Sequence, residues 1–317
     1  MILLSVFLLI GSLFLIAIVS DKIINYTLVL SKVFGLSEMA AGFVLLSVTT
    51  SLPELSVSIF SSTSGEGGLS VGNVLGSNIA NLTIIIGLAV FLSKTAIHLR
   101  GESQKELIQF LFLSSVIPLF IVQRGSLGPV LGIVLLILFV YFSFTISKTP
   151  KQSQITEQQN GSTEKPLRAG LKFVVCLIII IVLSRLIVDS SIDIADFVNL
   201  PSSIIGATII GVGTSLPELA TTIQTLKKKY YEMALGNLLG SCITNITLVL
   251  GISSLVSFSE VNILAVESIM FYVLIASLTV WYMISSNKAI NKKGAIFLSA
   301  IYFAFVLQQV GFSVFIF

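Results

Sequence analysis

The pentapeptide Thr-Ser-Leu-Pro-Glu occurs twice in this chain, at residues 50–54 and again at residues 214–218. Each copy lies in the middle of a long apolar segment, and each ends on a glutamate. The two copies belong to a longer repeat, because residues 42–88 align with residues 206–252 at an offset of 164 without a gap, and 18 of the 47 aligned positions are identical. Two unrelated apolar helices would match in Leu, Ile and Val. Most matches here are Thr, Ser, Pro, Glu, Gly and Asn, so the repeat reflects a shared structure and not a shared composition.

The composition excludes a water-soluble protein. The chain has 317 residues, of which 55% are hydrophobic and only 10% are charged, and its mean hydropathy is +1.03. A soluble domain carries about 25% charged residues, so this chain lacks the charge that would cover a soluble surface. Disordered and fibrous proteins are excluded as well, because neither class is this apolar. Apolar runs of roughly 17 or more residues recur along the chain, and each can cross a ~30 Å hydrocarbon layer as a helix.

The apolar segments predict an all-α, polytopic membrane protein with ten transmembrane helices. Barrel strands would give short alternating segments instead of these long continuous ones. Residues 1–147 form a first five-helix half with the repeat copy 42–88, and residues 170–317 form a second half with the copy 206–252. The polar stretch 148–169 is typical of a flexible linker. Five crossings separate the two copies, and because five is odd we expect the second half to have inverted topology. The predicted crossings are 2–19, 36–63, 69–92, 106–122, 128–147, 170–188, 201–226, 232–256, 263–285 and 293–315.

The basic residues predict the orientation. With the amino terminus outside, 16 of the 18 Lys and Arg residues fall in cytoplasmic loops or their flanks, and the exceptions are Arg124 and Arg185. Cytoplasmic loops carry an excess of Lys and Arg, so this orientation is favoured over its opposite. We expect a multi-pass protein of the cell membrane with both termini outside and the linker 148–169 in the cytoplasm.

Glu54 and Glu218 predict a bound cation. A carboxylate at membrane depth costs several kcal/mol, and it stays ionised only beside a cation or a basic group. The basic residue nearest to the predicted membrane core is Arg185, close to the outer end of its helix. A mobile cation is therefore the better partner for the two carboxylates. The alternative is a pair of protonated glutamates that make structural hydrogen bonds.

Pro53 and Pro217 precede the two glutamates and predict broken helices. Because proline has no N–H, the carbonyls four residues back, those of Thr49 and Gly213, lose their helical partner and the helix kinks. Free carbonyls at this depth are tolerated only where they face protein or a hydrated cavity. Converging carbonyl, hydroxyl and carboxylate oxygens suit Ca²⁺, which takes 6–8 oxygen ligands at about 2.3–2.6 Å. Na⁺ accepts the same ligand types.

A second repeated motif supplies hydroxyl and amide groups. Residues 72–81 read Gly-Asn-Val-Leu-Gly-Ser-Asn-Ile-Ala-Asn, and residues 236–245 read Gly-Asn-Leu-Leu-Gly-Ser-Cys-Ile-Thr-Asn. The glycines let neighbouring helices approach closely. Asn73 and Asn237 have two equally good explanations, which are interhelical hydrogen bonding and a role in the cation site. Each copy also holds a serine and an asparagine four residues apart, which share one helix face and are expected to line the site: Ser77 with Asn81, and Ser241 with Asn245.

These motifs resemble the α-repeats of the cation/calcium exchanger superfamily, in the form of its sodium/calcium exchanger branch. The chain is similar to the compact prokaryotic members, which have ten helices and a short linker. The resemblance implies that Ca²⁺ is bound by Glu54 and Glu218 together with the backbone carbonyls of Thr50 and Thr214. It also implies that both glutamates take part in flanking Na⁺ sites. The other ligands of these sites would be the hydroxyls of Ser51, Ser77, Ser215 and Ser241 and the backbone carbonyls of Ser47 and Gly211. Asn81 and Asn245 would line the centre.

Two positions depart from the family pattern. The residue before the threonine is usually Gly, which the second copy keeps as Gly213, whereas the first copy has Thr49. We therefore expect incomplete symmetry between the outer Na⁺ sites. Some archaeal relatives carry Asp at the position of Asn245. With Asn in both copies the site has two formal negative charges, which balance one Ca²⁺ and disfavour a potassium-coupled relative.

These expectations predict a secondary-active antiporter that exchanges Na⁺ for Ca²⁺ by alternating access and extrudes Ca²⁺. A Ca²⁺/H⁺ antiporter of the same superfamily is the nearest alternative, because a desolvated glutamate can carry a proton. A passive cation channel is a remote one. An enzyme is disfavoured, because the predicted spans contain no serine–histidine dyad, histidine cluster or paired aspartates. No prosthetic group and no nucleic acid are expected. The expected partners are Ca²⁺ and Na⁺, with H⁺ in the alternative, and the lipid bilayer, and a monomer is compatible with the motifs.

Overall fold

The computed structural model describes most of the chain, and this part is almost entirely helical. Some predicted segments lie outside the described part. They are most of the linker, 149–164, and one end of each of three predicted crossings, 120–122, 201–209 and 310–315. The described residues are 2–63, 67–93, 97–98, 103–119, 126–148, 165–197, 210–256, 259–260, 263–287 and 289–309.

The helices of the first half are interrupted twice by π-helical turns, η1 and η2. Neither turn was predicted, because a π turn leaves the apolar pattern of its helix almost unchanged. In chain order the elements are α1 (Ile2–Phe34), α2 (Glu38–Ala40), η1 (Ala41–Ser47), α3 (Val48–Thr50), α4 (Leu52–Thr63), α5 (Gly67–Ala80), η2 (Asn81–Ile85), α6 (Ile86–Ser93), α7 (Ser103–Val116) and α9 (Pro129–Ser147).

The described elements of the second half follow the order of the first, except that none corresponds to α2 and η1, whose matching residues lie mostly outside the described part. It contains α11 (Pro166–Phe197), α13 (Gly211–Thr214), α14 (Leu216–Lys227), α15 (Tyr231–Thr244), η4 (Asn245–Val249), α16 (Leu250–Val256), α17 (Ile263–Asn287) and α18 (Lys292–Gln309). Helix α11 begins at Pro166, inside the predicted linker 148–169.

Two short antiparallel strand pairs join loops of the two halves. Strand β1 (Ile97–His98) pairs with β4 (Ala289–Ile290), and β2 (Ser126–Leu127) pairs with β3 (Ser259–Glu260). No strands were predicted, since two residues are too few to leave an alternating pattern. The pairs do not change the helical class of the protein.

The described helices are those of a polytopic membrane protein. Five are long and apolar enough to cross a membrane, and a sixth span arises if the segments Glu38–Thr50 and Leu52–Ile59, which are bent by 42°, are taken together. Among the described residues, fewer than ten helices are long and apolar enough to cross a membrane, so the ten crossings stay a prediction. The five helices are Ser70–Ser93, Pro129–Ser147, Pro166–Leu183, Tyr231–Val256 and Val266–Ser286.

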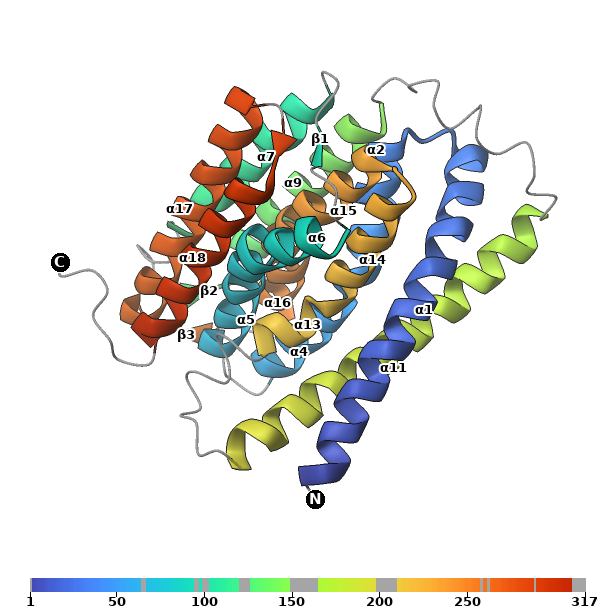
Figure 1. Cartoon of the computed structure of the whole chain (residues 1–317). Helices are drawn as coiled ribbons and strands as arrows, with labels where there is room; N and C mark the ends of the chain where they lie inside the picture. The colour runs from blue at the N-terminus through green and yellow to red at the C-terminus, as the bar shows by residue number, and fades with distance from the viewer. Residues whose placement is uncertain are drawn as a thin grey trace.

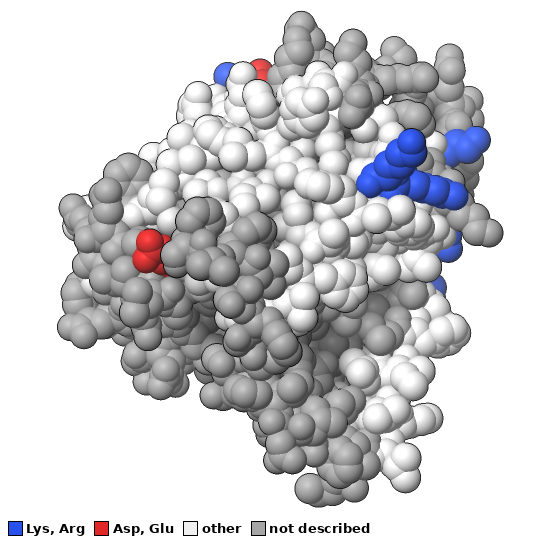
Figure 2. Space-filling view, turned by 60° about the vertical axis from the view of Figure 1, so that its left-hand side comes forward, with Lys and Arg blue, Asp and Glu red and all other residues white. Residues whose placement is uncertain are grey.

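Burial separates central helices from peripheral ones. The helices Ser70–Ser93 and Tyr231–Val256 are 83% and 78% buried within the protein, whereas Pro129–Ser147 and Pro166–Leu183 are only 22% and 28% buried. The exposed residues of the peripheral helices are largely apolar, as lipid contact requires. Figure 2 shows a broad uncharged face, and the Lys and Arg side chains that are visible in this view lie mostly along its right-hand side. The two repeat copies therefore supply the centre of the molecule.

The first helix of each half stands at one side of the bundle. Helices α1 and α11 are packed along one another and run in opposite directions (Figure 1). Near the amino terminus of α1, the Ser5 hydroxyl donates a hydrogen bond to Asp193 Oδ2 of α11 at 2.8 Å. Helix α1 also packs against α14 and η1. The pair thus borders the segments that carry the Thr-Ser-Leu-Pro-Glu motifs.

Candidate functional site

Both Thr-Ser-Leu-Pro-Glu motifs lie where a helix breaks. Helix α3 ends at Thr50 and α4 begins at Leu52, with Ser51 between them at φ −84° and ψ 6°. In the second half Ser215 separates α13 from α14 at φ −85° and ψ 3°. The proline falls in the first turn of each new segment, where its missing N–H costs nothing. Thr50 and Thr214 are therefore the last residues of the helical segments that precede the breaks.

The two glutamates are fully buried and poorly satisfied. Glu54 and Glu218 each have zero solvent exposure. Neither oxygen of the Glu54 carboxylate has a hydrogen-bond partner among the described residues, and neither does Oε2 of Glu218. The remaining oxygen, Oε1 of Glu218, accepts a long bond of 3.5 Å from the Ser51 hydroxyl. Buried polar atoms without partners are rare and costly, so these oxygens require a ligand or a proton.

Each carboxylate is surrounded by hydroxyl groups of both halves. The neighbours of Glu54 are Ser77 of its own half and the pair Thr214 and Ser215 of the other half. The neighbours of Glu218 are the equivalent residues at the offset of 164, namely Ser241 of its own half, and Thr50 and Ser51 of the first half. The site is therefore built by both repeat copies together.

Hydroxyl contacts connect the broken segments to the central helices. Ser77 Oγ of α5 lies 3.2 Å from Thr214 Oγ1 and donates to the carbonyl of Gly211 at 3.4 Å. Around the other break Thr50 Oγ1 lies 3.4 Å from Ser241 Oγ, and the carbonyl of Ser47 accepts a bond of 3.4 Å from Thr50 of its own half. All ten predicted ligand residues described so far thus lie in one buried region.

Asn81 and Asn245 lie at the first residues of the π turns η2 and η4. Both atoms of the Asn81 amide are buried without a partner among the described residues, and so is Oδ1 of Asn245. The Asn245 amide nitrogen donates to Asn78 Oδ1 at 3.2 Å, and the Asn78 amide in turn donates to the carbonyl of Cys242 at 3.0 Å. These bonds join the two central helices, and π turns are frequent at functional sites. Sequence reasoning missed the role of Asn78, because its aligned partner Cys242 is a different residue type.

Asn73 and Asn237 hold the backbone at the glutamates. The Asn73 amide donates to the carbonyl of Glu54 at 3.1 Å and to Ser58 Oγ at 3.0 Å. The Asn237 amide donates to the carbonyl of Glu218 at 3.4 Å. The two asparagines therefore make interhelical hydrogen bonds and position the carboxylates through the backbone. Their repetition at the offset of 164 was the signal for this role.

Glycines set how closely the halves approach. A Cβ added to Gly42 would lie 2.3 Å from the carbonyl oxygen of Met233 and 3.1 Å from the Cα of Gly236. A Cβ added to Gly211 would lie 3.0 Å from the carbonyl carbon of Gly76. The backbones of η1 and α15 are thus in direct contact, and so are those of α13 and α5. This proximity brings the carbonyls of one half to the serines of the other.

The two sides of the site are not identical. Thr49, in place of the usual glycine, donates its hydroxyl to the carbonyl of Leu45 at 2.6 Å and so bonds within its own helix. Ser47 donates to the carbonyl of Phe43 and lies 3.1 Å from Thr244 Oγ1. The aligned positions of the second pair are Gly211 and Ala80, which have no hydroxyl.

The chemistry of the site is that of hard oxygen ligands. Arg185 does not reach it, because its guanidinium is exposed and forms an ion pair with Asp189 at 3.0 Å. The described residues contain no group of three or more His, Cys, Asp and Glu side chains that could hold a metal ion. Carboxylates, hydroxyls and carbonyls fit Ca²⁺ or Na⁺ and not a soft metal.

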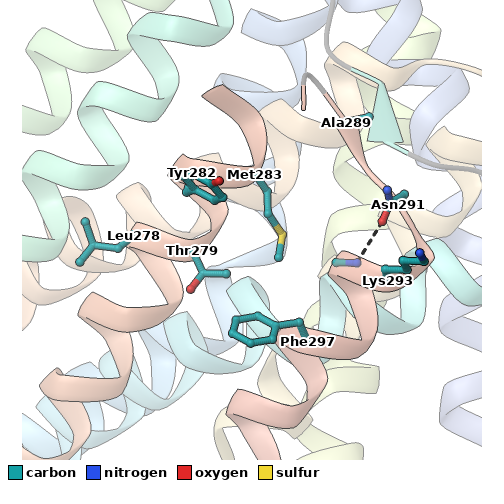
Figure 3. A pocket seen from close by; sticks show the side chains of 9 residues that line it. Leu278, Thr279, Tyr282, Met283, Ala289, Asn291, Lys293 and Phe297 are labelled. Carbon is teal, nitrogen blue, oxygen red and sulfur yellow. Dashed lines mark hydrogen bonds between the residues drawn. The ribbon is translucent and has the colours of Figure 1, made fainter. Parts of the chain in front are cut away.

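A cavity of about 620 Å³ lies elsewhere, between α17 and α18. Its walls include Tyr282, Met283 and Phe297, and near its rim the backbone N–H of Gly294 donates to Asn291 Oδ1 at 3.0 Å (Figure 3). Glu54 and Glu218 do not line this cavity.

Comparisons with known proteins show what the whole chain is similar to. The family described as sodium/calcium exchanger protein matches residues 4–148 and 169–311. The inner membrane protein YrbG of Escherichia coli is 33% identical over 274 residues, which cover 83% of each chain. The sodium/calcium exchanger MaX1 of Methanosarcina acetivorans is 29% identical, with 91% of this chain and 93% of that protein covered. The structure of the sodium-calcium exchanger NCX_Mj soaked with Na⁺ and Ca²⁺ superimposes with a TM-score of 0.78 at 25% identity, over 98% of this chain and 99% of that one.

Proposed function

The chain belongs to the sodium/calcium exchanger protein family, and we propose that it is a secondary-active antiporter that exchanges Na⁺ for Ca²⁺ across the cell membrane. Extrusion of Ca²⁺, driven by inward flow of Na⁺, is the proposed direction. The proposal includes no enzymatic activity and no prosthetic group, and a monomer contains the complete site.

One observation supports the proposal above all others. Each of the two buried carboxylates lies beside hydroxyl groups of the other half. Three of their four oxygens have no partner among the described residues. Two negative charges balance one Ca²⁺, whose preferred ligands are oxygens. A buried pair of acids without a basic group is stable when a cation neutralises it.

The proposed Ca²⁺ ligands are the carboxylates of Glu54 and Glu218 and the backbone carbonyls of Thr50 and Thr214. The helix breaks at Ser51 and Ser215 support the carbonyl assignments, because Thr50 and Thr214 are the last residues of the helical segments that end there. Proposed Na⁺ sites flank this centre and share the two carboxylates. Their further ligands are the hydroxyls of Ser51, Ser77, Ser215 and Ser241 and the carbonyls of Ser47 and Gly211, and Asn81 and Asn245 line the centre.

The proposed architecture has ten transmembrane helices in two halves of inverted topology, with both termini outside. The equivalent contacts around Glu54 and Glu218 support the repeat, and so does the matching order of the helices from α3 in the first half and from α13 in the second. Helices α1 and α11 border both broken segments. A movement of this pair against the remaining helices would expose the buried carboxylates to one side of the membrane at a time.

The test is Ca²⁺ uptake into proteoliposomes under one imposed ion gradient at a time. We expect ⁴⁵Ca²⁺ to accumulate when an outward Na⁺ gradient is imposed, and uptake to saturate with Ca²⁺ concentration. Uptake that is driven equally well by a K⁺ gradient, or that occurs without any gradient, would contradict the proposed exchange. Single-channel currents in a planar bilayer would point to a passive channel instead.

A Ca²⁺/H⁺ antiporter is the second candidate. The carboxylate oxygens that lack partners can carry a proton as well as a metal ion. Hydroxyl groups around both carboxylates favour Na⁺, since a protonated glutamate needs only one acceptor. Ca²⁺ uptake driven by a pH gradient in Na⁺-free buffer would establish this second candidate.

A further inference from the structure

The cavity of about 620 Å³ between α17 and α18 lies at the lipid-facing surface of the bundle. Three of its lining side chains are large, apolar or aromatic, and exposed, namely Leu278, Tyr282 and Phe297. In a chain that spans a membrane, exposed side chains of this kind face hydrocarbon and not water. The side chains of Met283 and Phe297 point into the space between the two helices (Figure 3). The cavity therefore offers an apolar surface to lipid.

One end of this cavity is polar and positively charged. Asn291 and Lys293 line it where α18 begins. Because Asn291 Oδ1 accepts the backbone N–H of Gly294 at 3.0 Å, the first turn of α18 is capped and the backbone of Lys293 is held in place. Lys292 is exposed beside it. Neither lysine has an ion-pair partner among the described residues, and the nine lining residues include no acid.

The matching end of the other half does not carry this charge. At the same offset of 164, Lys292 and Lys293 correspond to Gly128 and Pro129, where α9 begins. The predicted inversion of the halves puts that end at the opposite face of the membrane. The predicted orientation puts the two lysines at the cytoplasmic face, where the leaflet holds anionic lipids that attract Lys and Arg.

We propose that this cavity binds one anionic phospholipid of the bilayer. Its phosphate group contacts Lys292 and Lys293, and an acyl chain lies against Tyr282, Met283 and Phe297. The volume falls within the ~300–1,000 Å³ that is usual for ligand pockets. A zwitterionic lipid fits the apolar part equally well, but its cationic headgroup opposes the lysines, so charge selects the ligand. This inference does not depend on the transported ions, and it uses the predicted orientation only to name the leaflet.

Fluorescence quenching by brominated lipids tests the site. Trp281 is the one tryptophan of the chain, so Trp281→Phe gives a background without tryptophan. In this background Phe297→Trp places a fluorophore in the cavity, and Ile133→Trp places one at the matched exposed position of α9. Each variant is reconstituted into phosphatidylcholine vesicles with increasing fractions of phosphatidylglycerol, or of phosphatidylcholine, that carries bromine on its acyl chains.

The two tryptophan positions should respond differently. We expect Phe297→Trp to reach half-maximal quenching at a fraction of the anionic lipid at least about tenfold lower than that of the zwitterionic lipid. Ile133→Trp should show the same midpoint for both lipids. A common midpoint at Phe297→Trp would show ordinary bilayer contact and overturn the proposal. An equal preference for the anionic lipid at Ile133→Trp would overturn it as well.

A pair of charge-removing substitutions tests the headgroup contact. Lys292→Gln with Lys293→Gln should abolish the preference for phosphatidylglycerol at Phe297→Trp. The matched control is Lys227→Gln with Lys229→Gln, which removes the same charge from two exposed lysines at the same predicted face and should keep the preference within about twofold. If both pairs lose the preference, general surface charge explains it and the proposed site is wrong.

Native mass spectrometry gives a readout that needs no tryptophan substitution, and it decides if thermal unfolding shows that Phe297→Trp does not fold. The parent chain and the two glutamine pairs are each mixed with equal amounts of phosphatidylglycerol and phosphatidylcholine in detergent. We expect one bound phosphatidylglycerol on the parent chain and on the control pair, and its loss from the pair at Lys292 and Lys293. Retention of this lipid by all three proteins, or its loss from both pairs, would contradict the proposal.

Discussion

Replacing one of the two buried glutamates tests whether their charge holds the cation. Glu54→Gln and Glu218→Gln keep the shape of each side chain and leave an amide oxygen near the position of the carboxylate. The change lowers the formal charge of the site from −2 to −1. Because Ca²⁺ carries twice the charge of Na⁺, its binding should suffer more.

The size of the effect follows from Coulomb's law. At a ligand distance of ~2.4 Å and an effective dielectric constant of ~20, one carboxylate attracts Ca²⁺ by about 14 kcal/mol and Na⁺ by about 7 kcal/mol. These gross values are offset by the amide dipole that remains and by the cost of burying a charge, which is several kcal/mol per ion. The cost of burying the carboxylate is common to the two ions, whereas the attraction by the remaining amide dipole scales with the charge of the ion and so reduces the loss of each ion in proportion. We expect a net loss of at least about 3 kcal/mol for Ca²⁺, a factor of more than ~100 in affinity, and a smaller loss for Na⁺.

Calcium binding in detergent and Na⁺-driven ⁴⁵Ca²⁺ flux in proteoliposomes measure this change. The matched control is Glu267→Gln, which removes an acid from an exposed position on α17 and should leave both readouts unchanged. Thermal unfolding of each variant verifies that the protein is folded. The two glutamates occupy equivalent surroundings, so the two variants should lose affinity to a similar degree.

One outcome would refute the reasoning directly. If either folded variant retained Ca²⁺ affinity and flux within about twofold of the parent chain, the carboxylate would not be a ligand. An equal loss for Na⁺ and Ca²⁺ would also contradict the electrostatic account, since the two ions differ in charge and hardly in size.

Two further changes test how the halves are held together. Gly42→Ala places a Cβ 2.3 Å from the carbonyl oxygen of Met233, so we expect overpacking to cost ~1–3 kcal/mol and to lower the Tm by several degrees. Gly11→Ala, where nothing lies within 4 Å, is its control, and a Tm drop of equal size there would contradict the packing argument. Lys228→Met removes an ion pair with Asp21 at 2.9 Å. Because both side chains are partly exposed, we expect less than ~1 kcal/mol of lost stability. Salt should reduce the difference in Tm between the parent chain and the variant. If this difference does not shrink in 1 M salt, the pair acts through packing and not through charge.

The repeated motif allowed much of the site to be predicted before any coordinates. Buried acids, prolines and hydroxyls in two equivalent segments are local features, and their cost at membrane depth makes a cation site the natural explanation. The apolar runs predicted the helices for a similarly local reason. The residues with no repeat signal were missed, as Asn78 shows, because its partner position holds Cys242.

The sequence by itself determined the class of the protein and the chemistry available to it, because hydropathy and the ligand properties of side chains belong to each residue alone. Only the tertiary structure decided which groups meet. It joins Glu54 to Thr214 and Ser215, about 160 positions away along the chain. It also leaves the Ser62 hydroxyl buried without a partner among the described residues, whereas Leu226, at the matching position, packs in the hydrophobic core. Such pairings depend on the angle and depth at which two helices pack. Close contacts such as that between Gly42 and Gly236 set this geometry, and it exists only when both halves are folded together.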